Sequence, residues 1–142
     1  MMDFLNRLKE YLEGLPFTPS VIRIGTFDEN TDSIALRLSP GSINDRDLES
    51  GKVYNFSFQI LVHKKNHLVA YETIMKIMNE LDNIDKSKIN TDESKYYLIL
   101  IECTTTPNYV QKTNYGELYT AIFNAELYVK KEVWINGVWI NE

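Results

Sequence analysis

The side chains of this sequence that could carry out chemistry are few and widely spaced. Cys103 could act as a nucleophile if His63 or His67 lay beside it as a base. It ends an apolar run, however, where a small buried residue is the simpler interpretation. The two histidines stand four residues apart across an expected strand-to-helix break, so they do not share one helix face as metal ligands. We expect both histidines to be solvated at the surface, with no catalytic or metal-binding role.

Carboxylates gather in two acidic stretches that could supply a general acid–base pair or a calcium site. These stretches contain Asp28, Glu29 and Asp32, and Asp45, Asp47 and Glu49. The spacing of a calcium-binding EF-hand loop is absent, and acidic loops are usually solvated. No GxGxxG or GxxxxGKS/T pattern appears, so no phosphate-binding loop is indicated. The sequence therefore predicts a protein that is not an enzyme and has no cofactor.

The charge balance excludes several kinds of partner. The 142 residues include 15 Lys and Arg against 20 Asp and Glu, a formal net charge of -5, which argues against tight binding to nucleic-acid phosphates. No apolar run approaches the roughly 20 residues of a membrane-spanning helix, and the N-terminus lacks the apolar stretch of a secretory signal. A chain of this length can bury a core without a disulfide. We expect one domain over residues 1–142, made in a cytoplasm.

Helical spacing of apolar residues indicates two amphipathic helices. The first covers 4–15, and the second covers 67–81 with Asn66 as its N-cap. The stripe of the second helix that we expect to face the sheet contains Leu68, Tyr71, Ile74, Met75, Met78 and Leu81.

Alternating or continuous apolar runs indicate the strands, which lie at 21–27, 33–39, 52–63, 96–103 and 117–131. We expect the first two to form a hairpin, 96–103 to be a central strand, and 82–95 and 104–116 to be loops. Asn136-Gly137 between two short apolar runs predicts a hairpin over 133–140. The order implies an α+β domain with a mainly antiparallel sheet, two helices packed on one face and a C-terminal β-hairpin.

This layout resembles a known family. After the first helix, the segments ALRLSPG at 35–41, YNFSFQILVH at 54–63 and AYETI at 70–74 follow one another around an acidic loop. TPNY at 106–109 and the strand YTAIFNAEL at 119–127 come later. The succession resembles the minor capsid and tail-terminator proteins of long-tailed bacteriophages, or of prophages, of Gram-positive hosts.

The resemblance implies a virion structural protein at the junction of tail and head, assembled in the cytoplasm of a bacterial host. Such proteins form a hexameric ring that stops polymerisation of the tail tube and presents a surface to the head-completion (stopper) protein. The implied partners are further copies of the chain, the tail-tube protein and the head-completion protein. Two alternatives stay open: a neck or head-completion protein of the same virion, and a small ligand-binding α+β domain with its pocket between the sheet and the helix at 71–81.

Two aromatic features exceed what a single core needs. The 104–116 segment carries Tyr109 and Tyr115, and the terminal hairpin carries Trp134 and Trp139. Because Tyr and Trp are enriched at protein interfaces, we expect these four residues at contacts between subunits. The alternative is that they cover the core of their own domain.

The acidic loops gain a meaning in a ring through which DNA passes. A loop that lines the channel would repel phosphates, so DNA would pass without specific binding. The residues expected to face the channel or a partner are Asp28, Glu29, Asp45, Asp47 and Glu49.

Overall fold

The order of the elements agrees with an α+β domain. A computed structural model places residues 2–19, 21–39, 48–135 and 137–141, and it describes their side chains except at 2, 132–135 and 139–141. Along this part of the chain the elements are α1 (Met2–Glu13), β1 (Arg23–Ile24), β2 (Ser33–Leu38), β3 (Val53–Lys64), α2 (His67–Asp82), the short 3-10 helix η2 (Lys86–Lys88), β4 (Tyr96–Lys112), β5 (Glu117–Val129), β6 (Glu132–Ile135) and β7 (Val138–Asn141). The predicted fold class, α+β with a mainly antiparallel sheet, is confirmed.

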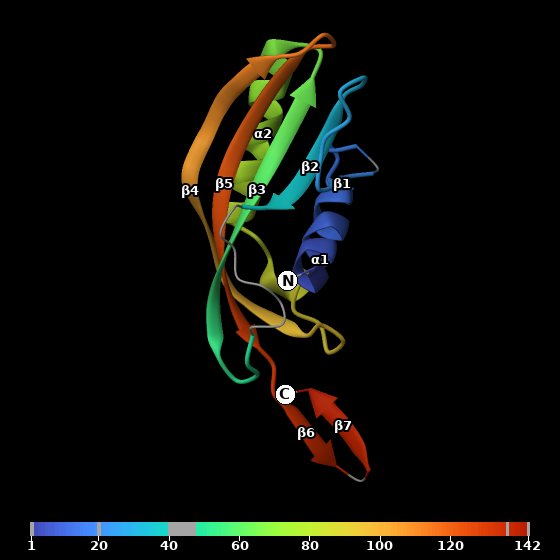
Figure 1. Cartoon of the computed structure of the whole chain (residues 1–142), viewed down its shortest axis with the longest axis vertical. Coiled ribbons are helices and arrows are strands. Elements are labelled where there is room, and N and C mark those ends of the chain that lie inside the picture. The colour runs from blue at the N-terminus through green and yellow to red at the C-terminus, as the bar shows by residue number, and fades with distance from the viewer. Residues whose placement is uncertain (1, 20, 40–47, 136, 142) are drawn as a thin grey trace.

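The main sheet has five strands in the order β1-β2-β3-β5-β4 (Figure 1). At its centre, β3 and β5 pair antiparallel without interruption from Val53 opposite Tyr128 to Lys64 opposite Glu117. Both strands alternate between core-facing and outward-facing residues, so every core residue of β3 lies beside a core residue of β5. This ladder is the rigid element to which the loops at both ends are attached.

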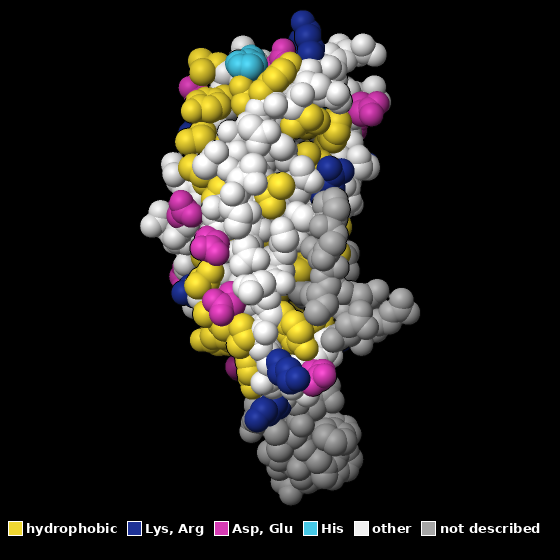
Figure 2. Space-filling view, turned by 60° about the vertical axis from the view of Figure 1, so that its left-hand side comes forward, with side chains coloured by type: hydrophobic (Ala, Val, Ile, Leu, Met, Phe, Trp, Pro, Cys, Tyr) yellow, Lys and Arg dark blue, Asp and Glu magenta, His cyan; other side chains and the backbone are white. Residues whose placement is uncertain are grey.

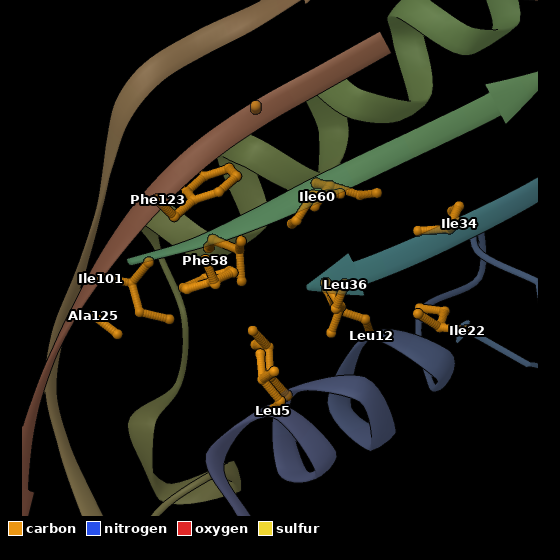
Figure 3. Packing of buried hydrophobic residues seen from close by; sticks show 14 of the residues in the cluster. Leu5, Leu12, Ile22, Ile34, Leu36, Phe58, Ile60, Ile101, Phe123 and Ala125 are labelled. Carbon is orange, nitrogen blue, oxygen red and sulfur yellow. The ribbon is translucent and has the colours of Figure 1, made fainter. Parts of the chain in front are cut away.

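One face of the sheet carries the main hydrophobic core. Phe4 of α1 meets Phe56 and Phe58 of β3 edge-on, with ring centroids 5.7 and 5.9 Å apart, and Phe58 stacks on Phe123 of β5 at 5.5 Å. Residues from α1, β2, β3, β4 and β5 point into the same interior (Figure 3), and the same buried cluster includes Ile74 of α2. Each large apolar side chain buried here contributes about 1.5–3 kcal/mol.

The second helix is rotated relative to the predicted stripe. Asn66 caps it as predicted, because its side chain accepts the N–H of Val69. The buried residues of α2 are Ala70, Thr73, Ile74, Ile77 and Leu81, whereas Leu68 and Tyr71 are exposed. The small side chains at 70 and 73 let the helix approach the sheet closely, which turns its larger N-terminal side chains outward.

The first two predicted strands do not form a hairpin. β1 is only two residues long and pairs parallel with β2, with Arg23 opposite Ala35. Because the two strands run in the same direction, the segment between them must bring the chain back to the end of the sheet where β1 begins. Gly25 starts this segment with a φ of 106°, which favours glycine.

The predictions for β4 are also wrong. It is an edge strand rather than a central one, and it continues through most of the expected 104–116 loop to Lys112. Its register against β5 shifts at four places between Leu98 and Gln111. Such bulges break the alternation on which a sequence-based prediction depends. Pro107 is tolerated because an edge strand leaves one side of its backbone unpaired.

The connection at 82–95 is anchored rather than purely a surface loop. Ile89 is buried in the core cluster, and the side chain of Asn90 exchanges two hydrogen bonds with the backbone of Leu98, at 2.6 and 3.0 Å. Ser94 is buried and donates to the carbonyl of Tyr96. These contacts fix the start of β4.

β6 and β7 form a separate antiparallel sheet beyond the end of β5 (Figure 1). Gly137 turns the chain between them with a φ of 81°, the left-handed conformation that a two-residue hairpin turn requires. The hairpin points along the long axis, away from the main sheet.

Candidate assembly surfaces

His63 is a buried side chain with hydrogen bonds from both ring nitrogens at one end of the sheet. It occupies the end of β3 on the face opposite the helices and is completely buried. Its Nδ1 lies 3.0 Å from the carbonyl oxygen of Asp28 and 2.9 Å from that of Thr31, and its Nε2 lies 2.7 Å from Thr113 Oγ1. Because Nδ1 faces two carbonyl oxygens, it carries the proton that donates to them. The expectation of a solvated His63 is therefore wrong.

Tyr115 closes over His63 from the β4–β5 turn. Their ring centroids are 5.4 Å apart, and Phe27 contacts the same imidazole at 5.0 Å. The hydroxyl of Tyr115 donates to Asp32 Oδ1 at 3.0 Å, which raises the pKa of Tyr115, and the backbone N–H of Lys65 donates to the same oxygen. Residues 28–32, the end of β3 and the β4–β5 turn are thus tied into one rigid end of the molecule.

A second aromatic cluster surrounds His67 at the same end. The hydroxyl of Tyr119 lies 2.8 Å from His67 Nε2, and the Tyr119 ring contacts those of Tyr71 and Tyr109 with centroids 5.9 and 5.5 Å apart. His67, Tyr71 and Tyr109 are exposed, whereas Tyr119 is buried. We call these four residues the aromatic patch. Figure 2 shows hydrophobic side chains gathered near a histidine at this end.

Tyr109 is held in place by a carboxylate. Its hydroxyl donates to Glu117 Oε2 at 2.6 Å, and this bond raises the pKa of Tyr109 to about 12. A tyrosine fixed by such a bond loses little further side-chain freedom on binding, which suits it to a contact surface.

Four of the predicted site residues thus lie at one end of the sheet: Asp28, Glu29, Tyr109 and Tyr115. Alternating sequence patterns did not reveal His67, Tyr71 and Tyr119 as their companions. His67 and Tyr71 have the i, i+4 spacing of one helix face, which was the available signal. Tyr119 pairs with Tyr109 only because of the bulges in β4.

The remaining predicted residues lie elsewhere. Glu49 is at the opposite end of β3, where its carboxylate pairs with Lys52 at 2.8 Å, which lowers the pKa of Glu49. Asp28 also has a basic neighbour, Arg23, at 3.7 Å. Asp45 and Asp47 lie outside the described residues, and Trp134 and Trp139 belong to β6 and β7 but have side chains outside the description. The acids that can be placed do not form one cluster.

Cys103 lies within β4 rather than at the end of a strand. It is half-buried and packs against the core cluster, and its burial raises the pKa of its thiol. Among the described residues, no group of three or more His, Cys, Asp or Glu side chains could hold a metal ion. Within the same residues, no helix has the length and apolarity to cross a membrane.

A family model for bacteriophage tail terminator proteins matches residues 11–129. The chain belongs to the bacteriophage tail terminator family. The match runs from the last turn of α1 to the final residue of β5. It therefore includes the whole main sheet, α2 and the aromatic patch of this tail terminator, and it leaves out the β6–β7 hairpin. Membership confirms the resemblance seen in the sequence, and it implies contacts with other components of the virion tail or head. No curated protein matches the chain.

Proposed function

We propose that the protein assembles into a hexameric ring that caps the phage tail tube and joins the tail to the head-completion protein. The family match over residues 11–129 carries this proposal, because it spans all five strands of the main sheet. The protein then acts by binding other proteins at the tail–head junction, and it carries out no catalysis.

A closed ring needs two different surfaces on each subunit that fit one another. The described part of the chain offers several candidates. The outer edge of β4 runs along the sheet from Tyr96 to Lys112, and an edge strand can pair with another chain. The aromatic patch and the terminal hairpin lie at opposite ends of the molecule, where they can serve different partners.

The charge of the chain suits a channel through which DNA passes. Its formal net charge of -5 disfavours the retention of phosphates. Asp28 and Glu29 lie at one end of β3 and Glu49 at the other, so we propose that one of the two acidic loops lines the channel while the other faces a partner. A ring whose lumen is neutral or basic would contradict this proposal.

The ring is tested with the full chain and its tail-tube protein. Light scattering at several concentrations, with and without tubes, should reveal a particle of about 100 kDa, six times 16.6 kDa. Electron microscopy should show the particle at one end of tubes that no longer grow. A protein that stays monomeric while tubes lengthen in its presence would overturn the proposal. Binding to heads but not to tubes would instead identify a head-completion protein.

A further inference from the structure

The face of the main sheet opposite the helices carries an exposed apolar row at the end where β5 leaves the domain. Val53 and Tyr97 lie on either side of Tyr128 in the register, so their three side chains share this face. Leu100 lies on the same face, opposite Glu126 in the next row. Val53 and Tyr97 are each 49% exposed and Leu100 is 36% exposed. We call Val53, Tyr97, Leu100 and Tyr128 the open-face patch.

The terminal hairpin has the composition of a segment that needs a partner. Residues 133–140 contain Val133, Trp134, Ile135, Val138, Trp139 and Ile140 around the Asn-Gly turn. An isolated two-stranded hairpin is at best marginally stable in water, and it gains stability by packing an apolar face on another sheet. The family match ends at 129, so this hairpin lies outside the matched segment.

The hairpin is acidic, and lysines flank the open-face patch. Residues 132–142 contain two Glu and no Lys or Arg. Lys95 and Lys131 are exposed at the end of the sheet that carries the open-face patch, whereas Lys52 at this end is paired with Glu49 and Glu126 lies beside Leu100. Figure 2 shows basic and acidic side chains beside hydrophobic ones in this region.

The hairpin of one chain is poorly placed to cover the patch of the same chain. The backbone N–H of Lys130 is still bonded to the carbonyl of Lys95, which leaves Lys131 as the single residue between that bond and β6. The distance spanned from Lys130 to Glu132 is at most about 7 Å, whereas stacked sheets lie about 10 Å apart. The hairpin instead points away from its own sheet (Figure 1).

We propose that the β6–β7 hairpin of each copy docks on the open-face patch of the next copy. This contact is heterologous, because the hairpin and the patch are different surfaces, and repeated around an axis it closes a ring. The inference rests on the proposed ring, and it identifies the two surfaces that hold neighbouring subunits together.

Both tryptophans of the chain lie in the hairpin, so Trp fluorescence reports on this segment alone. As the full-length protein assembles with rising concentration, its Trp emission should shift to shorter wavelength. Leu100→Glu should abolish the shift and weaken assembly at least tenfold, whereas Val21→Glu, at an exposed site near the other edge of the sheet, should leave both unchanged. Equal behaviour of the two variants would overturn the inference.

A disulfide test identifies the occupant of the patch. In a Cys103→Ser background, a copy with Val138→Cys is mixed with a copy with Leu100→Cys under mild oxidation, and Val21→Cys replaces Leu100→Cys as the control. A disulfide-linked dimer in the first mixture only supports the inference. A disulfide within single chains that carry both substitutions, or a ring that forms without any such link, overturns it. The latter result leaves the proposed function intact, whereas the absence of any ring removes the proposed function as well.

Discussion

Gly116 packs directly against the backbone of Lys64, so closely that a Cβ at residue 116 would lie 2.3 Å from the Lys64 carbonyl oxygen. A side chain there must push the β4–β5 turn away from the end of β3. We expect Gly116→Ala to lower the free energy of unfolding by about 1–3 kcal/mol in urea denaturation. Gly14→Ala is the control, because its Cβ would meet atoms no nearer than 3.5 Å. Equal free energies of unfolding for the two variants would show that the β4–β5 turn can move to accommodate a Cβ at residue 116 without loss of stability.

Replacing His63 should test the buried network at this end. His63→Phe keeps a ring between Phe27 and Tyr115 but removes the imidazole N–H from the Thr31 carbonyl, whereas the Asp28 carbonyl still accepts from the Ser33 hydroxyl. Each buried polar group without a partner costs about 1–3 kcal/mol.

The matched control for this prediction is His67→Phe, since His67 is exposed and its imidazole is hydrogen-bonded to the hydroxyl of Tyr119. Thermal unfolding followed by circular dichroism should show a clearly larger loss for His63→Phe. Losses of the same size would mean that the bonds of His63 add no stability.

Glu13 should make the free energy of unfolding depend on pH in the acidic range. Burial raises the pKa of its carboxyl, but bonds from the N–H of Ile22 at 2.6 Å and from Lys9 at 2.9 Å outweigh burial and hold the pKa below 4.5. A lowered pKa in the folded state gives stability that is present above pH 4.5 and is lost as the pH falls through the folded pKa. Glu13→Gln should cost about 1–2 kcal/mol at neutral pH.

The difference between Glu13→Gln and the natural chain should shrink as the pH falls below 4.5. Urea denaturation from neutral to acid pH measures it. If the difference in free energy of unfolding stays constant with pH, Glu13 does not contribute to the loss of stability in acid.

Tyr109 should have a pKa well above the ordinary tyrosine value of 10. The bond to Glu117 raises its pKa to about 12, so the bond is intact below pH 10 and is lost as the pH rises toward the folded pKa. Glu117→Gln should return the pKa toward 10, and Tyr109→Phe should remove the signal. Ring-carbon NMR shifts of labelled tyrosine measure this. A Tyr109 pKa unchanged by Glu117→Gln would contradict the assigned cause.

The sequence predicts those elements whose apolar residues keep a regular period. α1, β3, α2 and β5 all begin and end within two residues of the predicted bounds, which is the usual uncertainty at element ends. The family also follows from their order. The prediction for β4 is wrong because its bulges interrupt the alternation of apolar residues. The second part of the strand, from residue 104 to Lys112, therefore has the sequence pattern of a loop.

The candidate sites were harder to predict than the elements. Tyr109 and Tyr115 could be chosen by residue type alone, but the hydrogen-bond partners of His63 come from two segments, around 28–31 and at 113, that are distant along the chain. No local pattern encodes such contacts, because they depend on the register of the sheet. The prediction of which α2 residues face the sheet is wrong for a related reason. Ala70 and Thr73 are buried against the sheet, and hydrophobicity alone does not indicate that small side chains pack there.

The position of His63 has a consequence for the accuracy of folding. β3 and β5 are long strands that each bury one apolar face, and a slip of one residue between such strands moves every side chain of one strand to the opposite face. A slipped β3 would bring the imidazole onto the helix-covered face, where the carbonyls of Asp28 and Thr31 are absent, and would turn its phenylalanines toward solvent. The hydrogen bonds of His63 therefore form only in the native register of the two central strands, and they add to the free-energy difference between that register and a slipped one.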